Sequence, residues 1–249
     1  MRKFNVIQHS YHEFLGNLEK PLENREIGFV YIRPFIGQAV PGSPQDTDAL
    51  ILLPGPMAPT EKEAYPYLAE EVFLVGQYLR GDQPVIGLGL GALLLAEQQG
   101  GTVAEEPAIT AGFTTAHKTE AGAGDPLAEA MDGKEVCLWH AGSATLPAGV
   151  APLLVDDEGR WLAFRPHAKA YGLLFRPEIK PGILEDMLLE GRNLPDDVSA
   201  ILEHARTAFA QGRTQEVVDA VMVALVSELA LMQPHARDDP GFDFQVVDD

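Results

Sequence analysis

The sequence predicts an α/β fold in which helices flank a doubly wound, mostly parallel sheet. The chain has 249 residues, of which 46% are hydrophobic, enough for one large domain with a sizeable core. Short apolar runs alternate with longer segments of helical pattern, as in chains that form parallel sheets. One run, beginning at Pro84, ends in alternating glycines and passes directly into helix-favouring residues, which predicts a strand, a tight turn and a helix. Ligand sites in such sheets lie at the carboxyl ends of the strands.

Strands and helices are expected to alternate in the first half of the chain. The apolar and β-branched runs predict strands at residues 4–8, 25–33, 49–53 and from 84 onward. Helices are expected at residues 12–23 and 61–80. The run at 49–53 is continuously apolar, which is typical of a central parallel strand.

The second half is expected to complete the sheet and then become helical. Further strands are predicted at residues 100–104, 135–140, 151–155 and 161–164, the last two antiparallel across a turn. The section between the first two of these is expected to be loose, with a helical turn at 126–131. Helices are predicted at residues 182–190, 196–211 and 214–232, with Gly212 between the last two. The apolar stripe of the last helix indicates core or dimer packing.

This pattern divides the chain into three parts. We expect a main domain over residues 1–190, a helical extension over 191–237 that packs on it, and an acidic tail over 238–249. The tail is interpreted either as a frayed terminus or as an extended segment that docks on its own or another chain.

The charge, apolar runs and cysteine content of the chain narrow its expected partners and location. The formal net charge is −19, which would repel a phosphate backbone, so nucleic acid is not expected as a partner. Such charge indicates a solvated acidic surface that keeps the protein in solution. The more specific alternative is a surface that binds a basic partner protein. No apolar run reaches membrane-spanning length and the N-terminus shows no signal-peptide pattern, so a soluble, cytoplasmic protein is expected. The single cysteine, Cys137, excludes an internal disulfide framework.

The segment from Pro84 to Gly101 resembles the nucleophile elbow of the class I glutamine amidotransferase family. The family reads roughly Pro-Val-Leu-Gly-Ile-Cys-Leu-Gly-Ala-Gln-Leu-Leu-Ala, followed by Gly-Gly, and this sequence aligns with it without a gap. Gly89 stands at the position of the nucleophilic cysteine, and Leu93 at that of the glutamine. The resemblance implies that family's flavodoxin-like fold, here with a helical C-terminal extension.

Three further stretches support the resemblance, and they occur along the chain in the same order as in the family. Gly55 matches the glycine whose amide helps form the family's oxyanion hole, whereas Pro54 replaces the glycine before it. The pair Trp139 and His140 matches a Trp-His pair of close family members.

The last of these stretches, Tyr171 to Glu178, carries the rest of the family's catalytic triad. The family reads Tyr-Gly-Val-Gln-Phe-His-Pro-Glu there, with the histidine as catalytic base and the glutamate as its orienting partner. Glu178 matches the glutamate, but Arg176 stands at the histidine's position.

These replacements remove the chemistry of glutamine hydrolysis. The reaction needs a thiolate, a base and amides that receive the oxyanion. Gly89 supplies no nucleophile, and a permanently protonated Arg176 cannot act as a base. Cys137 cannot replace the thiol, because it lies three residues before His140 on a strand and should face the other side. No histidine spacing resembles a metal site, and no cofactor is expected.

Two arrangements of the altered pocket remain open. In one, Arg176 pairs with Glu178 and plugs the old pocket. In the other, Arg176, the amides of Gly55 and Leu90 and the helix N-terminus bind a small anion. Both need Arg176 at the elbow, where Leu93, Trp139 and His140 are expected to line the pocket.

The sequence leaves two classes of function. The first is a pseudoenzyme, catalytically inactive as a glutaminase, that acts as a binding or regulatory subunit with a protein partner or as a homo-oligomer. The second is an enzyme that uses the elbow pocket for non-thiolate chemistry or for binding a small anion or a nucleotide. The nucleotide reading rests on the G-x-G-x-x-A pattern from Gly87 to Ala92, with Glu105 or Glu106 as the ribose-binding acid.

Overall fold

The computed structural model describes residues 2–190, 194 and 197–233. The predicted acidic tail over 238–249 lies outside these residues, as does part of the predicted helical extension. The boundary at residue 190 therefore stays a prediction.

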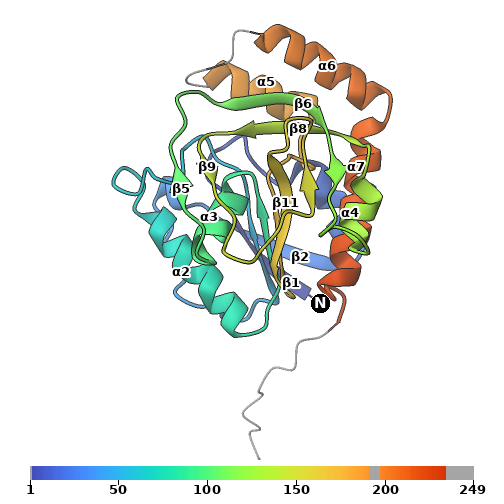
Figure 1. Ribbon diagram of the computed structural model, residues 1–249. Coiled ribbons are helices and arrows are strands. Elements are labelled where there is room, and N and C mark those ends of the chain that lie inside the picture. The colour runs from blue at the N-terminus through green and yellow to red at the C-terminus, as the bar shows by residue number, and fades with distance from the viewer. Residues whose placement is uncertain (1, 191–193, 195–196, 234–249) are drawn as a thin grey trace, which may run out of the picture.

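One eight-stranded sheet forms the centre of the molecule, and its mixed, mostly parallel character confirms the predicted fold class (Figure 1). Five neighbouring strands are parallel: β2 (Ile27–Ile32), β1 (Arg2–Ile7), β3 (Ala49–Leu52), β4 (Val85–Leu88) and β12 (Ala170–Leu173). Three antiparallel strands extend the sheet beyond β12: β11 (Trp161–His167), β10 (Leu154–Val155) and β7 (His117–Lys118). The strands β3, β4 and β12 are buried along their whole length, as predicted for β3 from its continuous apolar run.

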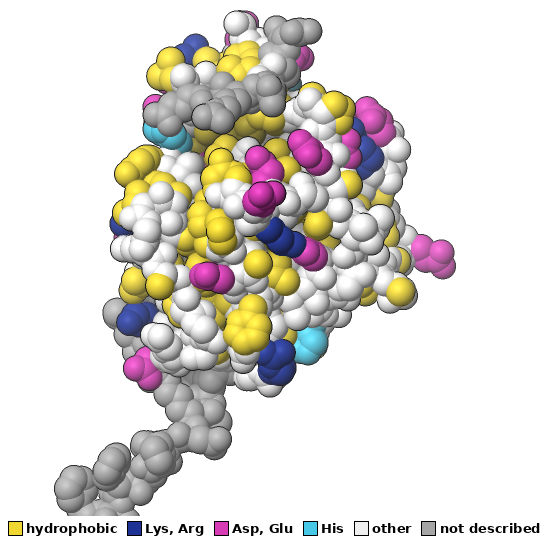
Figure 2. Space-filling model, turned by 90° about the vertical axis from the view of Figure 1, so that its left-hand side faces the viewer, with side chains coloured by type: hydrophobic (Ala, Val, Ile, Leu, Met, Phe, Trp, Pro, Cys, Tyr) yellow, Lys and Arg dark blue, Asp and Glu magenta, His cyan; other side chains and the backbone are white. Residues whose placement is uncertain are grey.

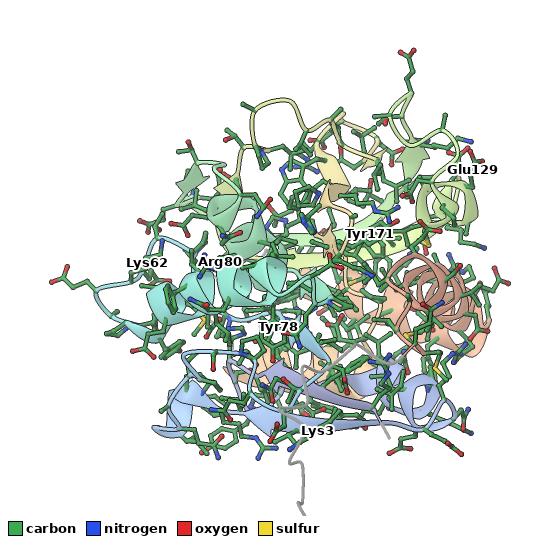
Figure 3. All side chains as sticks on the ribbon, turned by 90° about the horizontal axis from the view of Figure 1, so that it is seen from below. Lys3, Lys62, Tyr78, Arg80, Glu129 and Tyr171 are labelled. Carbon is green, nitrogen blue, oxygen red and sulfur yellow. The ribbon has the colours of Figure 1, made fainter. Side chains whose placement is uncertain are left out.

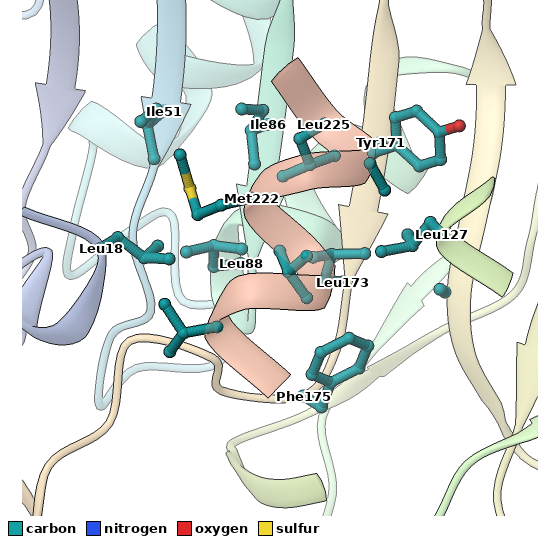
Figure 4. Packing of buried hydrophobic residues seen from close by; sticks show 14 of the residues in the cluster. Leu18, Ile51, Ile86, Leu88, Leu127, Tyr171, Leu173, Phe175, Met222 and Leu225 are labelled. Carbon is teal, nitrogen blue, oxygen red and sulfur yellow. The ribbon is translucent and has the colours of Figure 1, made fainter. Parts of the chain in front are cut away.

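Helices cover both faces of this sheet. Alternate residues of β3 point to opposite faces: Ile51 packs with α7 (Arg213–Glu228), whereas Leu50 and Leu52 pack with α2 (Tyr67–Arg80). Figure 4 shows how Met222 and Leu225 of α7 lie against strand residues such as Ile86 and Leu88. The apolar stripe of the last helix is thus part of the core. The same face also carries the short helices η1 (Gly16–Leu18), α1 (Glu19–Glu23) and α4 (Pro126–Met131), while α3 (Leu90–Gln98) lies on the α2 side.

A smaller layer covers one end of the sheet. It contains the antiparallel pair β6 (Thr110–Thr115) and β8 (Glu135–His140), the pair β5 (Val103–Ala104) and β9 (Ser143–Ala144), and the helices α5 (Pro181–Glu190) and α6 (Val198–Ala210). Residues of α5 and α6 pack against the side of β8 that carries Cys137 and Trp139. Figure 1 shows β6, β8, α5 and α6 at the top of the molecule, with β5 and β9 lower on the left.

Three expectations about local structure are wrong. The helix expected at 12–23 begins only at η1, because Gly16 adopts φ +52°, outside the right-handed helical region. The helix expected at 61–80 begins at Tyr67, after a turn and the N-cap residue Pro66. The section expected to be loose contains β6 and β7; Gly112 adopts φ +133° and the residues of β6 are half-buried, so the strand shows no hydrophobic alternation.

Polar contacts join the helices to the sheet. The Tyr78 hydroxyl of α2 accepts a hydrogen bond from Asn5 Nδ2 at 2.9 Å and lies 2.5 Å from the Thr47 hydroxyl (Figure 3). Charged side chains stand singly or in small groups among hydrophobic and uncharged ones on the face shown in Figure 2. In the described part of the chain, no helix combines the length and the apolar character that crossing a membrane requires.

Candidate functional site

The turn between β4 and α3 has the shape of a nucleophile elbow, with a glycine at its tip. Gly89 adopts φ +52° and ψ −114°, and its amide donates a 2.8 Å hydrogen bond to the carbonyl of Leu173 in the neighbouring strand. A Cβ atom built on Gly89 would lie 3.0 Å from Cβ and 3.2 Å from Cγ of Pro54. The ring of Pro54 therefore crowds the place where a side chain at residue 89 would begin.

The other glycines of the elbow serve close packing. A Cβ atom on Gly91 would lie 2.3 Å from the carbonyl oxygen of Leu52, and one on Gly87 would lie 2.4 Å from that of Gly91. Both positions thus let α3 approach β3 and β4 closely, which accounts for the glycine pattern without a bound pyrophosphate.

The predicted oxyanion-hole glycine lies in an equally crowded place. A Cβ atom on Gly55 would lie within 2.7–2.9 Å of Leu90 Cδ2, Met57 Sδ and His9 Cβ. Leu90 is itself buried at the first position of α3. The structure thus places Gly55 next to the side chain of Leu90, and the oxyanion hole formed by their amides stays a prediction.

Arg176 is fully buried, and each of its three nitrogens meets a partner. Its Nε donates to Glu178 Oε1, and its Nη1 lies 3.2 Å from both Glu13 Oε1 and the carbonyl oxygen of Trp139. Its Nη2 lies 3.9 Å from Met187 Sδ in α5. The guanidinium is therefore held between the loop after β1, β8 and α5.

This placement agrees with only part of the sequence-based expectation. The pair of Arg176 and Glu178 is present, but none of the guanidinium contacts is with Gly55, Gly89 or Leu90. The atoms nearest to a side chain at residue 89 belong to Pro54. The ion pair is therefore held by Glu13, Trp139 and Met187, and these contacts support neither a plug nor a cationic pocket at the elbow itself.

Two carboxylates share this one buried cation. Burial lowers the pKa of Arg176, but Glu178 and Glu13 more than offset this, so the net shift is upward and the guanidinium stays charged. Burial raises the pKa of Glu178 against the opposing effect of Arg176. Because Glu178 Oε2 is buried without a hydrogen-bond partner among the described residues, the glutamate depends on Arg176 for its compensation.

A second buried acid–base pair, which sequence reasoning did not single out, lies next to Gly55. His9 Nε2 lies 2.8 Å from Glu71 Oε2, and its Nδ1 lies 3.0 Å from the carbonyl oxygen of Pro54. A carbonyl only accepts, so Nδ1 carries a proton. Burial lowers the pKa of His9, but the nearby Glu71 and Glu13 raise it more, so the net shift is upward. The available signal was the position of His9 directly after a strand that ends at this edge of the sheet.

The remaining predicted pocket residues do not all meet. Cys137 and Trp139 face α5 and α6, whereas His140 lies on the other side of β8, which confirms that Cys137 and His140 point apart. Burial raises the pKa of the Cys137 thiol to about 12. Leu93 is fully buried in α3. Among the described residues, no group of three or more His, Cys, Asp or Glu side chains is placed to hold a metal ion.

We expect the two buried histidines to titrate in opposite senses. Burial lowers the pKa of His140 to about 4, so its ring should stay neutral down to that pH. His9 should remain protonated above the ordinary value of about 6.5. NMR titration of ¹⁵N-histidine-labelled protein, with His140→Asn and His9→Gln to assign the signals, measures both values. Two rings that titrate near 6.5 would contradict this prediction.

The direction of each pKa shift determines how the contribution of His140 and of His9 to folding stability changes with pH. The contribution of His140 is present at neutral pH and is lost as the pH falls from about 6.5 through about 4, because the unfolded chain binds the proton first. The contribution of His9 is present below about 6.5 and is lost as the pH rises through its raised pKa.

Comparison with known proteins gives a consistent result. The family model described as glutamine amidotransferase class-I matches residues 9–192. The glutamine amidotransferase-like protein YfeJ of Salmonella typhimurium is 31% identical over 163 residues, which are 64% of this chain and 67% of that protein.

Solved structures share the fold. A glutamine amidotransferase from Thermotoga maritima superposes with a TM-score of 0.78 at 22% identity, over 92% of this chain and 98% of that one. One from Methylobacillus flagellatus gives a TM-score of 0.80 at 20% identity, over 96% and 98%. The elbow between β4 and α3, the family match over most of the chain and the YfeJ relative agree, and the chain belongs to the class-I glutamine amidotransferase family.

Proposed function

We propose that this family member has no glutaminase activity and acts as a binding or regulatory subunit. The observation that carries the proposal is the state of Arg176, which stands at the position of the family's catalytic base and is buried between two glutamates. An arginine remains protonated at any ordinary pH and cannot accept a proton from a nucleophile. The position thus serves packing and charge compensation instead of proton transfer.

The nucleophile is absent for a separate reason. Gly89 has no side chain, and Pro54 crowds the space where one would begin. The thiol of Cys137 is buried on the side of β8 that faces α5 and α6, and burial raises its pKa to about 12, so almost no thiolate forms at neutral pH. The chain therefore lacks both the nucleophile and the base that glutamine hydrolysis requires.

One observation favours the second candidate, an enzyme with non-thiolate chemistry. The pair His9 and Glu71 is a potential acid–base couple next to Gly55, at the sheet edge where such folds bind ligands. Both side chains are fully buried, however, so a substrate would reach them only after a local rearrangement. A small anion or nucleotide at the elbow stays a lesser alternative, because Gly87 and Gly91 are explained by packing.

The proposed setting is cytoplasmic, with a protein partner or a second copy of the chain. The net charge of −19 supports a partner that is neither nucleic acid nor an anionic membrane surface. Mild purification of the tagged protein from its own cells, followed by native mass spectrometry, tests this part. A stoichiometric complex is the expected result, and a monomer without any bound protein would overturn the subunit role.

Loss of activity is tested by ammonia release from glutamine. The wild-type protein and Cys137→Ala should both show only the uncatalysed rate, while a family enzyme with an intact Cys-His-Glu triad provides the positive control. Wild-type turnover that survives Cys137→Ala would reveal an unrecognised nucleophile. Turnover that disappears in Cys137→Ala would assign the reaction to that thiol, and either result would overturn the proposed inactivity.

A further inference from the structure

A hollow of about 560 Å³ lies between β8, β9 and the β10–β11 hairpin, and we call it the lateral hollow. Its volume falls within the range of about 300–1,000 Å³ that is common for small-molecule sites. Much of its wall is apolar, with contributions from Leu138, Leu146, Trp161, Leu162 and Leu174. Its lining does not include Gly55, Gly89 or Arg176, so the lateral hollow is separate from the altered elbow. It therefore does not depend on the proposed loss of glutamine hydrolysis.

One buried side chain presents an unused hydrogen-bond acceptor there. His140 is only 6% exposed and lines the lateral hollow. Its Nδ1 lies 3.0 Å from the carbonyl oxygen of Gly142, so Nδ1 carries the proton and the neutral ring bears its lone pair on Nε2. Nε2 has no hydrogen-bond partner among the described residues. It is also not one of the unpaired polar atoms that are fully buried, so it remains accessible. The lone pair therefore opens onto the lateral hollow.

A hydroxyl group stands directly beside this acceptor. Thr110 of β6 pairs with His140 of β8 in the antiparallel register, so the two side chains share one face with Cβ atoms about 5 Å apart. Thr110 also lines the lateral hollow, and its hydroxyl forms no hydrogen bond with the described residues. A free acceptor and a free hydroxyl donor thus lie side by side.

The other polar side chains of the lateral hollow, Glu106, Ser143, Asp156 and Arg160, each have at least one polar partner within the protein. Asp156 accepts hydrogen bonds from the Glu158 amide at 2.9 Å, the Arg160 amide at 2.8 Å and Arg160 Nε at 2.6 Å. Ser143 Oγ donates to Glu106 Oε1 at 2.6 Å. His140 Nε2 and the Thr110 hydroxyl differ from these groups, because the described residues supply no hydrogen-bond partner for either one.

We propose that the lateral hollow binds a small neutral molecule that has an apolar, ring-sized body and a carboxamide-type edge. The N–H of such an edge donates to His140 Nε2, and its carbonyl accepts from the Thr110 hydroxyl. The ring packs against the apolar wall near Trp161, whose Nε1 donates to the Ala144 carbonyl at 2.8 Å and so fixes the indole. Glu106, Asp156 and Arg160 also line the lateral hollow, but each has a polar partner within the protein, so the apolar wall and the neutral His140 ring favour an uncharged body.

Benzamide is the probe for this site, and acetophenone is its matched control, since it keeps the ring and the carbonyl but lacks the N–H donor. Binding to the full chain is measured by calorimetry and by chemical-shift changes in ¹⁵N-labelled protein. We expect benzamide to bind about fivefold or more tightly than acetophenone, as one hydrogen bond to a desolvated acceptor requires. The shifted signals should include those of Thr110 and Trp161.

Two variants assign the preference to the two side chains. His140→Leu should bring the affinities for benzamide and acetophenone to within about twofold of each other. Thr110→Val keeps the shape of the side chain and should weaken both probes, because each uses its carbonyl there. His204→Leu, in α6, is the control histidine and should leave both affinities unchanged. Thr110→Val also serves as the informative variant if His140→Leu does not fold.

Three outcomes would overturn the proposal. The first is equal affinity of the wild-type protein for benzamide and acetophenone. The second is a preference for benzamide that survives in folded His140→Leu, and the third is the absence of binding by either probe up to its solubility limit.

Discussion

Arg176→Met will destabilise the protein by about 3–5 kcal/mol at neutral pH, the range found when one partner of a buried ion pair is removed. The substitution leaves Glu13 and Glu178 in the interior without their shared cation. Glu178 Oε2 already lacks a hydrogen-bond partner in the described structure, so the glutamate has little else to compensate its charge. Urea denaturation monitored by circular dichroism measures the loss.

The matched control is Arg206→Met, which removes an arginine from an exposed pair with Glu185. The Arg206 side chain is 58% exposed, and such pairs contribute about 0–1 kcal/mol. The difference between the two variants should shrink in acid, because burial raises the pKa of Glu178 and its protonation removes an uncompensated charge. Equal losses for Arg176→Met and Arg206→Met would show that the buried cluster does not have the assigned energetic role.

The triple variant Pro54→Gly/Gly89→Cys/Arg176→His should gain glutaminase activity at least about 10³-fold above the wild-type background, since it restores both the nucleophile and the base. Without the first change, Gly89→Cys/Arg176→His should be at least about tenfold less active, because a reacting atom displaced by a fraction of an ångström loses much of its efficiency. Pro54 Cβ lies 3.0 Å from the position of the new Cβ and would push it aside.

Ammonia release and trapping of the acylated thiol measure the effect of these changes. Pro54→Gly alone is the control and should remain inactive. Because a non-glycine residue at φ +52° costs about 1–3 kcal/mol, each variant must first be shown to be folded. Equal activity of the double and triple variants would remove Pro54 from the explanation, and an inactive but folded triple variant would show that the rest of the site has also changed.

The sequence was sufficient to predict the parallel strands β1 to β4, because they are apolar runs with turn residues at their ends, whereas β7 and β12 of the same sheet were not predicted. The run at Ala49–Leu52 and the glycine turn after β4 are local signals that tertiary structure did not override. The prediction failed where the local pattern was weak. Strand β6 contains Gly112 and half-buried side chains on both faces, so neither strand nor helix periodicity was visible.

The sequence predicted which residues occupy the site, but not which of them contact one another. Resemblance to the family identified the positions of Gly89, Arg176 and Glu178. The contact between Arg176 and Glu13 joins residues 163 positions apart, and that between His9 and Glu71 joins residues 62 positions apart. No local pattern encodes such pairs, because they join residues after strand ends to residues of other elements, such as Glu71 in α2, and so depend on the folded arrangement.

The contact between Pro54 and the space above Gly89 also bears on how this chain can change over time. A single substitution that returns a thiol to residue 89 meets the proline ring, and a single substitution that removes the proline brings no thiol. Arg176 adds a third requirement, because its loss alone exposes two interior carboxylates to one another. Under the proposed loss of hydrolysis, two of the three single substitutions carry a structural cost and the third brings no thiol, so no single substitution restores the reaction.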